Sequence, residues 1–177
     1  GGRFNAERTA GIRGMDFIEK SGKNEGMYDP YFMHASSKEG IAAINKWRQH
    51  ILNDFAARMN WTTTDKFSEA NHHPVAVIEN DSTFNCLNRV VKAGSLWVFD
   101  ATSSYDPDGD ELDYRWFVYK EPSSYKGEVQ LNVDEQGICC LRMPKEASGK
   151  NIHLILELSD SGVPQLTSYR RIVIHVK

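Results

Sequence analysis

The strongest constraint in this sequence is an alternation of apolar and polar residues that runs from Val75 almost to the end of the chain. Side chains of a β-strand point alternately to its two faces, so a period of two predicts half-buried strands. Clusters of Gly, Pro, Asp, Asn and Ser divide the pattern into short pieces. The candidate strands are Val75–Ile78, Ser95–Ala101, Leu112–Tyr119, Val129–Val133, Ile138–Met143, Ile152–Leu158 and Tyr169–Val176.

Seven short strands within about 100 residues have the number and size of an immunoglobulin-like antiparallel β-sandwich. No helix signal interrupts them, which disfavours a fold in which helices alternate with strands. We therefore expect a mainly β fold, with the sandwich over residues 74–177.

The first part of the chain follows a different pattern. Residues 1–35 hold many large apolar side chains without a sustained period, so we expect them to be irregular and packed against a surface. The segment Ser36–Glu39 has the S-x-x-E spacing of a capping box. It predicts a long amphipathic helix over about 37–60, whose apolar stripe is Ile41, Ile44, Ile51, Phe55 and Met59, flanked by Trp47 and Leu52.

Between the helix and the first candidate strand the periodicity disappears, and the segment ends in Pro74. We expect a linker at residues 66–73. One long helix and an irregular segment cannot enclose a hydrophobic core, so residues 1–65 look like the end of a domain that begins upstream. Alternatively, residues 1–65 drape over the sandwich as a helical extension.

Charge and hydropathy exclude some functions. The chain has 21 basic and 24 acidic side chains, a formal net charge of −3 and a pI near 6.1. There is thus no overall positive field to hold a nucleic acid backbone, and we expect no nucleic acid partner. The longest apolar runs are too short to span a bilayer, and we expect any export signal to lie outside this sequence.

The cysteines leave the cellular compartment open. Cys139 and Cys140 are adjacent, and three cysteines cannot form a full disulfide framework. One pair with Cys86 is possible, but we favour three small buried thiols.

Two stretches resemble known families. Gly94–Asp110, followed by Leu112, Tyr114 and Trp116, resembles the second and third strands of PKD-like and cadherin-like sandwiches. A longer set of motifs, spanning residues 40–177, resembles the C-terminal part of a bacterial family of cellulose-binding proteins with a nucleoside hydrolase-like domain. These motifs are Trp47-Arg48, Asn53–Met59, Trp61, Asn71-His72, Pro74, Asp106–Asp110 and Asp160–Arg171.

In that family an immunoglobulin-like domain follows the hydrolase-like domain. The resemblance therefore implies that residues 1–65 finish a nucleoside hydrolase-like domain and that the sandwich is appended to it. It also implies a secreted, cell-surface or periplasmic bacterial protein, with the upstream domain as partner. The family's metal-binding carboxylates would lie before Gly1, so we expect no catalytic residue and no enzyme activity in this chain.

The acidic run Asp106–Asp110 allows two interpretations. Its spacing fits neither an EF-hand loop nor the metal motif of nucleoside hydrolases. We favour a turn in which the aspartates accept backbone N–H bonds and Gly109 has a positive φ. The alternative is a weak Ca²⁺ site, the only cofactor that we consider, formed by Asp106, Asp108, Asp110 and Asp160.

The other side chains that bear chemistry form no recognisable catalytic pattern. His72 and His73 are adjacent and cannot share one tetrahedral ion without strain, so we predict no zinc site. The sequence lacks a Gly-x-Ser-x-Gly nucleophile turn and any local Cys-His signature.

Strand parity predicts a second surface. If Trp116, Leu156 and Ile174 point into the core, alternate residues of the same three neighbouring strands point outward and form a mixed apolar and aromatic patch. The helix and the irregular segment could cover this patch in an interdomain contact. Its residues would be Phe117, Tyr119, Ile155, Val173, Trp47 and Phe55.

Alternatively, the same patch binds carbohydrate, because sugar rings pack on aromatic side chains. The candidates are Tyr119, Tyr125, Tyr169 and Trp97, although Trp97 is in register with the core. We therefore expect a noncatalytic accessory module that binds carbohydrate or orients the parent protein. One alternative is a brace for an upstream enzyme that hydrolyses N-glycosyl or related bonds. Another is an adhesion or interaction module with loops made rigid by Ca²⁺.

Overall fold

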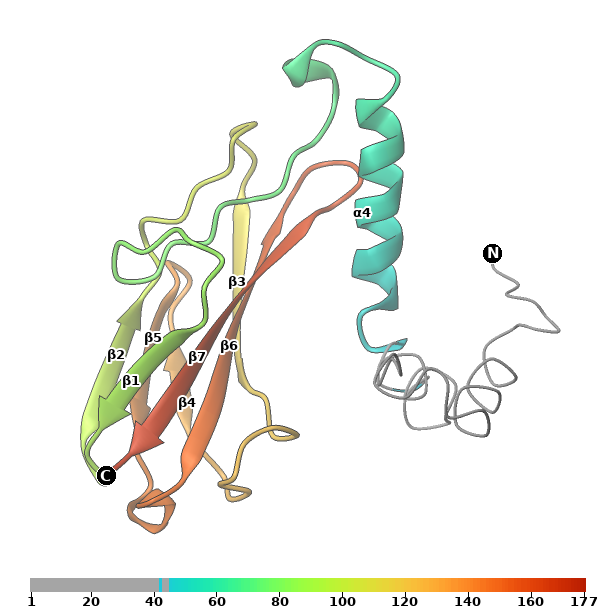
Figure 1. The fold of residues 1–177 in the computed structure, drawn as a ribbon. Coiled ribbons are helices and arrows are strands. Elements are labelled where there is room, and N and C mark those ends of the chain that lie inside the picture. Colours follow the sequence, from blue (N-terminus) through green and yellow to red (C-terminus); the bar gives the residue numbers. More distant parts are fainter. Residues whose placement is uncertain (1–41, 43–44) are drawn as a thin grey trace, which may run out of the picture. The chain divides into compact units, whose positions relative to one another are not determined.

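The computed structural model describes residues 42 and 45–177 (Figure 1). The chain divides into two compact units, Gly1–Leu52 and Asn53–Lys177. The irregular segment expected at 1–35, the capping box and the predicted helix start lie outside the described residues. The elements are α4 (Arg48–Trp61), η1 (Phe67–Glu69), β1 (Leu87–Val91), β2 (Leu96–Asp100), β3 (Leu112–Val118), β4 (Leu131–Val133), β5 (Ile138–Arg142), η2 (Lys145–Ala147), β6 (Asn151–Asp160) and β7 (Thr167–Val176).

The strands form two sheets, as Figure 1 shows. The larger sheet has the order β1-β7-β6-β3, and the smaller has the order β2-β5-β4. All pairs are antiparallel except β1 with β7, which is parallel. The predicted mainly β sandwich of about seven strands is confirmed.

The core lies between the two sheets. Leu154, Leu156 and Leu158 of β6 are fully buried there, together with Phe99 of the smaller sheet. The Phe99 and Trp116 rings stack with centroids 6.3 Å apart. Trp116 Nε1 donates to the Gly137 carbonyl at 3.2 Å, so the indole is buried without losing its hydrogen bond. The predicted inward set of β3, β6 and β7 is therefore correct.

One strand prediction is wrong. Val75–Ile78 forms only isolated bridges, Val75 with Tyr105 and Ile78 with Asp81. Ala76, Val77 and Ile78 are buried, but Glu79 and Asn80 have φ of 52° and 68°, which turns the chain before a ladder can extend. The strand at this edge is instead β1, whose sequence LNRVV carries two polar residues and a weaker alternation. The other six predicted strands occur, and β4 is shorter than expected.

The apolar face of α4 is largely exposed among the described residues. Of α4 only Ala57 is buried, while Ile51, Leu52, Phe55 and Met59 are 46–60% exposed. Within the unit 53–177 the helix is held by polar contacts instead. Asn53 Nδ2 donates to the Gln165 carbonyl at 2.8 Å, and Trp61 Nε1 donates to the Asn71 carbonyl at 2.8 Å. The helix ends at Trp61, one residue after the predicted end.

The segment between helix and sandwich is packed rather than loose. The His72 imidazole stacks on Trp61 with centroids 5.5 Å apart and on Phe67 at 3.7 Å. Asn71 is buried. This stacking fixes how residues 66–73 lead into the first buried residues of the sandwich.

The cysteines are free, but they are not all buried as predicted. Cys139 is buried, Cys140 is half-buried and Cys86 is exposed. The side chains of Cys139 and Cys140 point to opposite sides of β5, and only that of Cys139 lies in the core.

Candidate functional site

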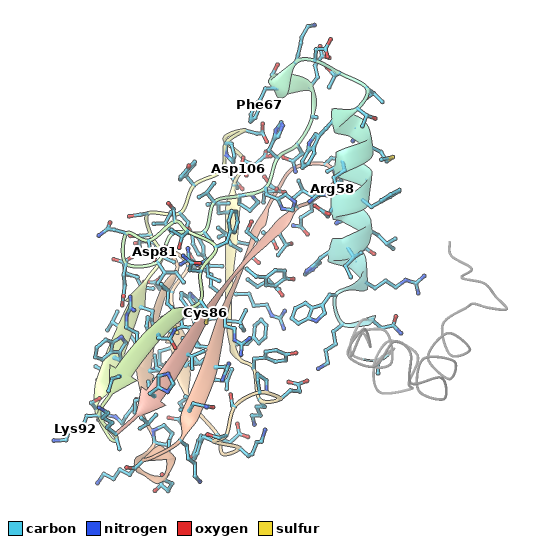
Figure 2. The ribbon with its side chains drawn as sticks, viewed as in Figure 1. Arg58, Phe67, Asp81, Cys86, Lys92 and Asp106 are labelled. Atoms are coloured by element: carbon cyan, nitrogen blue, oxygen red, sulfur yellow. The ribbon has the colours of Figure 1, made fainter. Side chains whose placement is uncertain are left out.

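A cavity of about 390 Å³ opens within the unit 53–177 (Figure 2 labels Arg58, which lines it). We call this cavity the helix groove. Its walls come from α4, from the segment after the linker, from a loop and from the start of β7. The lining residues are Asp54, Arg58, His73–Ala76, Ser82–Phe84 and Thr167–Arg170.

A charged triplet lies on one wall of the helix groove. Asp54 Oδ2 accepts from Arg58 Nε at 2.7 Å, and Asp54 Oδ1 lies 2.7 Å from His73 Nε2. The hydrogen bond from Arg58, more than that from His73, holds the pKa of Asp54 below its ordinary value. The wall therefore presents a carboxylate and a guanidinium together at the opening.

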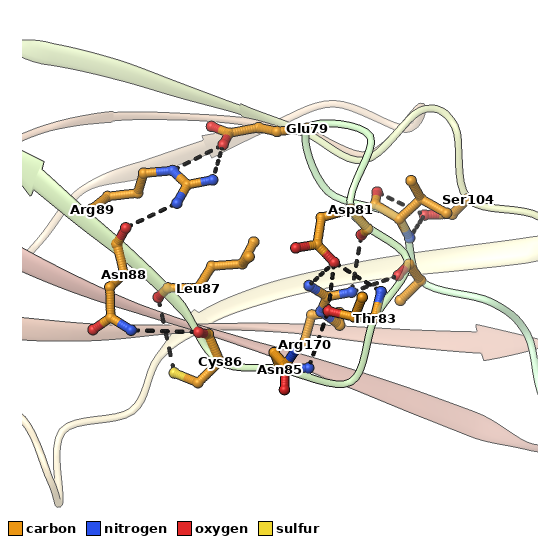
Figure 3. Close-up of polar contacts among 12 residues, drawn as sticks. Glu79, Asp81, Thr83, Asn85, Cys86, Leu87, Asn88, Arg89, Ser104 and Arg170 are labelled. Atoms are coloured by element: carbon orange, nitrogen blue, oxygen red, sulfur yellow. Dashed lines mark hydrogen bonds and ion pairs between the residues drawn. The ribbon is translucent and has the colours of Figure 1, made fainter.

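The floor of the groove is fixed by Arg170 of β7, which is only 2% exposed (Figure 3). Its Nη1 donates to the Asp81 carbonyl at 2.9 Å, and its Nη2 contacts Asp81 Oδ1 at 3.1 Å. The same Oδ1 accepts from the Thr83 backbone and hydroxyl at 2.8 and 2.7 Å. Hydrogen bonds from Thr83 in the first place, and from Arg170, lower the pKa of Asp81. This network holds the loop that carries Phe84.

Two aromatic residues line the groove. Phe84 is 97% exposed, so the whole face of its ring is accessible to a ligand. Tyr169 is 36% exposed. Burial in the first place, and then the charge of Glu157 and a hydrogen bond with it, raises the pKa of Tyr169, so its hydroxyl stays protonated at neutral pH.

The four predicted carbohydrate residues lie apart. Only Tyr169 lines the helix groove. Trp97 lies on β2 in the other sheet and packs against the core, and Tyr125 packs on the core with the Lys150 ammonium 5.6 Å from its ring centroid. Tyr119 follows β3, and its backbone N–H donates to the His153 carbonyl at 2.8 Å.

The predicted outward patch is more polar and less exposed than expected. Ile155 is buried, and Phe117 and Val173 are half-buried. Arg115 contacts two other residues of this face. Its Nη1 donates to Glu157 Oε1 at 2.7 Å, and its guanidinium lies 5.0 Å from the Phe117 ring centroid. Of the two residues from the predicted helix that were expected in the interdomain contact, Phe55 is 60% exposed, and Trp47 belongs to the unit Gly1–Leu52.

A second cluster of side chains lies at the loop 106–110, where Figure 2 labels Asp106. Carboxylate oxygens of Asp106, Asp108 and Asp110 lie within 4.8 Å of one another. Asp106 Oδ1 accepts from the backbone N–H groups of Asp108 at 2.8 Å and Asp110 at 3.2 Å, and Gly109 has φ of 87°. The predicted turn is confirmed.

Asp160 belongs to the same neighbourhood, as predicted. Burial raises the pKa of Asp110, with further contributions from the negative charges of Asp106, Asp160 and Asp108. Asp108 also binds the linker, since its Oδ2 accepts from the His72 backbone N–H at 2.7 Å. His72 and His73 thus contact different aspartates.

Sequence reasoning missed several groove residues. Asp54 and Arg58 had a usable signal, the i,i+4 spacing of opposite charges on a helix. Phe84 had none, because an isolated Phe in a loop without periodicity does not reveal whether it is exposed.

Residues 97–176 match a family model described as "Cellulose-binding protein Sde0182, C-terminal domain". Residues 97–176 are therefore similar to this family of C-terminal domains. The description is of a domain from a binding protein, the class of module that the sequence predicts. Among curated proteins, none matches the chain significantly.

The chain also resembles solved structures. A nucleoside hydrolase-related hypothetical protein from Saccharophagus degradans, associated with carbohydrate metabolism, is 43% identical over 76% of this chain, with a TM-score of 0.74. This chain spans about a third of that structure, 33% of its length. Human CDH23 EC21-23 is 15% identical over 59% of this chain and 35% of its own, with a TM-score of 0.42. The PKD domain from KIAA 1837 protein is 14% identical over 51% of this chain and 82% of its own, with a TM-score of 0.37.

The described helices include none with the length and apolar character needed to cross a membrane.

Proposed function

We propose that this chain is a noncatalytic accessory module that binds a polysaccharide of the cellulose type. The description of the matched family, a cellulose-binding protein, supports this class of ligand. The association of the Saccharophagus degradans relative with carbohydrate metabolism is consistent with it. With such a ligand, we infer a bacterial module outside the cytoplasm, in the periplasm, on the cell surface or secreted.

We place the binding site in the helix groove. The single observation that carries this assignment is the exposed Phe84 ring beside a groove whose wall carries Asp54, Arg58 and His73. Sugar rings present axial C–H groups that pack on aromatic faces, and hydroxyl groups that pair with carboxylates and guanidinium groups. Tyr169 supplies a second aromatic ring that lines the groove.

The parent protein is proposed to be longer. Because this chain spans about a third of its Saccharophagus degradans relative, we infer an upstream nucleoside hydrolase-like domain, of which residues 1–65 would be the end. Residues 66–73 would be the linker and 74–177 the appended sandwich. The contact of Trp47 and Phe55 with Phe117, Tyr119, Ile155 and Val173 remains part of this proposal, as the means by which the module is oriented.

Depletion from solution by insoluble cellulose tests the ligand. We expect the chain to be retained by microcrystalline cellulose, and the variant Phe84→Ala to be retained much less because the stacking ring is lost. The matched control is Leu96→Ala, which removes an apolar side chain that is 57% exposed on the other sheet. The control should bind as the unmodified chain does.

Two outcomes would contradict the proposal. A chain that remains fully in solution over cellulose, xylan and chitin would exclude a structural polysaccharide as ligand. Equal loss of retention in Phe84→Ala and Leu96→Ala would exclude the helix groove as the site and point to nonspecific apolar adsorption.

A further inference from the structure

The loop 106–110 and the neighbouring Asp160 concentrate negative charge in one place. We call Asp106, Asp108, Asp110 and Asp160 the aspartate cluster. Carboxylate oxygens of the first three already lie within 4.8 Å of one another. Among the ion pairs of the described residues, only His72 lies against any member, at 3.1 Å from Asp108. The charges of the aspartate cluster are therefore largely uncompensated by protein groups in the described part of the chain.

An independent observation comes from the linker. Asn71 is only 7% exposed, and its Nδ2 donates to Asp160 Oδ2 at 3.1 Å and to the Pro164 carbonyl at 2.9 Å. Both partners are acceptors, so the orientation of the amide is fixed and Oδ1 is left without a hydrogen-bond partner. A buried amide oxygen without a partner costs free energy unless a cation or water fills the space.

A second unpaired oxygen lies within the aspartate cluster itself. Asp106 Oδ2 is buried and has no hydrogen-bond partner, while Oδ1 of the same carboxylate holds the turn. Only five buried side-chain atoms in the described residues lack a partner, and these two both belong to this neighbourhood. Asn71, Asp108 and Asp110 line one cavity of about 560 Å³ together with Ser161 and Gly162. Asp106 does not line this cavity, but its carboxylate lies within 4.8 Å of those of Asp108 and Asp110.

We propose that this space binds a Ca²⁺ ion. The ligands are Asp106 Oδ2, the carboxylates of Asp108 and Asp110, and Asn71 Oδ1, with water completing the coordination. All are hard oxygen donors, and Ca²⁺ takes six to eight of them in flexible geometry. Asp160 contributes charge and holds the Asn71 amide, because its Oδ1 is already bonded to the N–H groups of Gly162 and Leu166 at 3.0 and 2.9 Å.

Such an ion would join two parts of the chain directly, and a third part, Asp160, would support it by holding Asn71. Asn71 lies in the linker, Asp106–Asp110 precedes β3, and Asp160 ends β6. The ion would therefore fix the entry of the linker into the sandwich. This inference does not depend on polysaccharide binding, since the aspartate cluster and the helix groove share no lining residue.

Calorimetric titration of the whole chain with CaCl₂ and with MgCl₂, after removal of metal with a chelator, tests the site. We expect saturable binding of one Ca²⁺ and no comparable heat with Mg²⁺, which keeps its own water shell. Thermal unfolding should show Tm raised by about 10 °C when Ca²⁺ is about a hundredfold above its Kd.

The variant Asp110→Asn removes one ligand charge from a side chain for which the structure gives no hydrogen bond. In chelator it should melt at the same temperature as the unmodified chain or higher, because repulsion within the aspartate cluster is relieved. It should lose at least about tenfold in Ca²⁺ affinity, since fewer ligand charges weaken a Ca²⁺ site. Asp106→Asn keeps an acceptor for the turn and should lose affinity as well.

The control is Asp113→Asn, an exposed aspartate on β3 outside the cluster. Its Ca²⁺ affinity should be unchanged. Absence of heat with Ca²⁺, or an equal loss of affinity in Asp113→Asn and Asp110→Asn, would overturn the proposal. Unchanged Ca²⁺ binding in Asp106→Asn and Asp110→Asn would show that the ion binds elsewhere and would overturn it too.

Discussion

Arg170 and Asp81 lie 89 residues apart in the sequence and form one partly buried contact. In it the guanidinium of Arg170 on β7 donates to both the carbonyl and the carboxylate of Asp81, in the loop before β1. Arg170 is almost fully buried, whereas the Asp81 side chain is about a third exposed, at 34%. The pair therefore ties an exposed loop to a central strand. It also positions Thr83 and Phe84 at the helix groove.

Arg170→Met should destabilise the sandwich by about 3 kcal/mol. The substitution removes a buried cation that satisfies two Asp81 oxygens and leaves those groups without their partner. Urea unfolding followed by tryptophan fluorescence measures the change. Arg142→Met, at an exposed residue of β5, is the control and should have little effect. Equal stability of the two variants would mean that the loop before β1 is held by other contacts.

Arg58→Met should weaken retention on cellulose by about tenfold, the value of one hydrogen bond from a charged group to a ligand hydroxyl. Arg58 lines the helix groove and orients Asp54. The fold should be unaffected, because Arg58 is exposed. Binding isotherms on microcrystalline cellulose give the affinity, and Lys92→Met, in the exposed turn between β1 and β2, serves as the charge-matched control. Retention that falls equally in both variants would indicate a general charge effect instead.

The unfolding free energy should fall as the pH is lowered below about 6.5. Burial in the first place, and the positive charges of Arg171 and His175, lower the pKa of His153 in the folded chain. The unfolded chain then binds a proton near the ordinary imidazole pKa of about 6.5, where the folded chain does not. The contribution of His153 to the unfolding free energy is therefore complete above about pH 6.5, and it is lost as the pH falls toward the pKa of His153 in the folded chain.

Urea unfolding at pH about 7.5 and about 5.5 measures this dependence, and His153→Gln should reduce the difference between the two values. Gln can still accept the hydrogen bond that Arg171 donates to His153 Nδ1, but it does not titrate. An identical pH dependence in the variant would assign the effect to other groups.

The three thiols should react with Ellman's reagent at well-separated rates. Cys86 is exposed and should react first, Cys140 more slowly, and Cys139 only after unfolding. Burial, with a smaller contribution from Cys140, raises the pKa of Cys139 to about 12, so the reactive thiolate is scarce at neutral pH. Cys86→Ser should remove the fast phase completely. A fast phase that persists in this variant would show that β5 opens readily.

Much of the fold follows from local pattern. The alternation in β6 and β7 predicts that successive side chains point to opposite faces of the sheet. It correctly assigns Leu154, Leu156 and Leu158 to the core. The spacing of the aspartates around Gly109 correctly predicts a turn, because the side-chain and backbone hydrogen bonds of that turn are local. The same local logic fails for Val75–Ile78. Its neighbour Glu79 turns the chain, and the edge strand is β1, whose Leu87 pairs in parallel with Ile172, 85 residues later.

By itself the sequence determined the sandwich, its inward side chains and the presence of concentrated carboxylates. Only the tertiary structure decided that Asn71 from the linker is buried beside Asp160, and that Phe84 shares a groove with Asp54 and Arg58. Periodicity shows which side chains of one helix or strand share a face. A binding site joins segments that are distant in sequence, and their meeting is set by the packing of the two sheets and the loops around them.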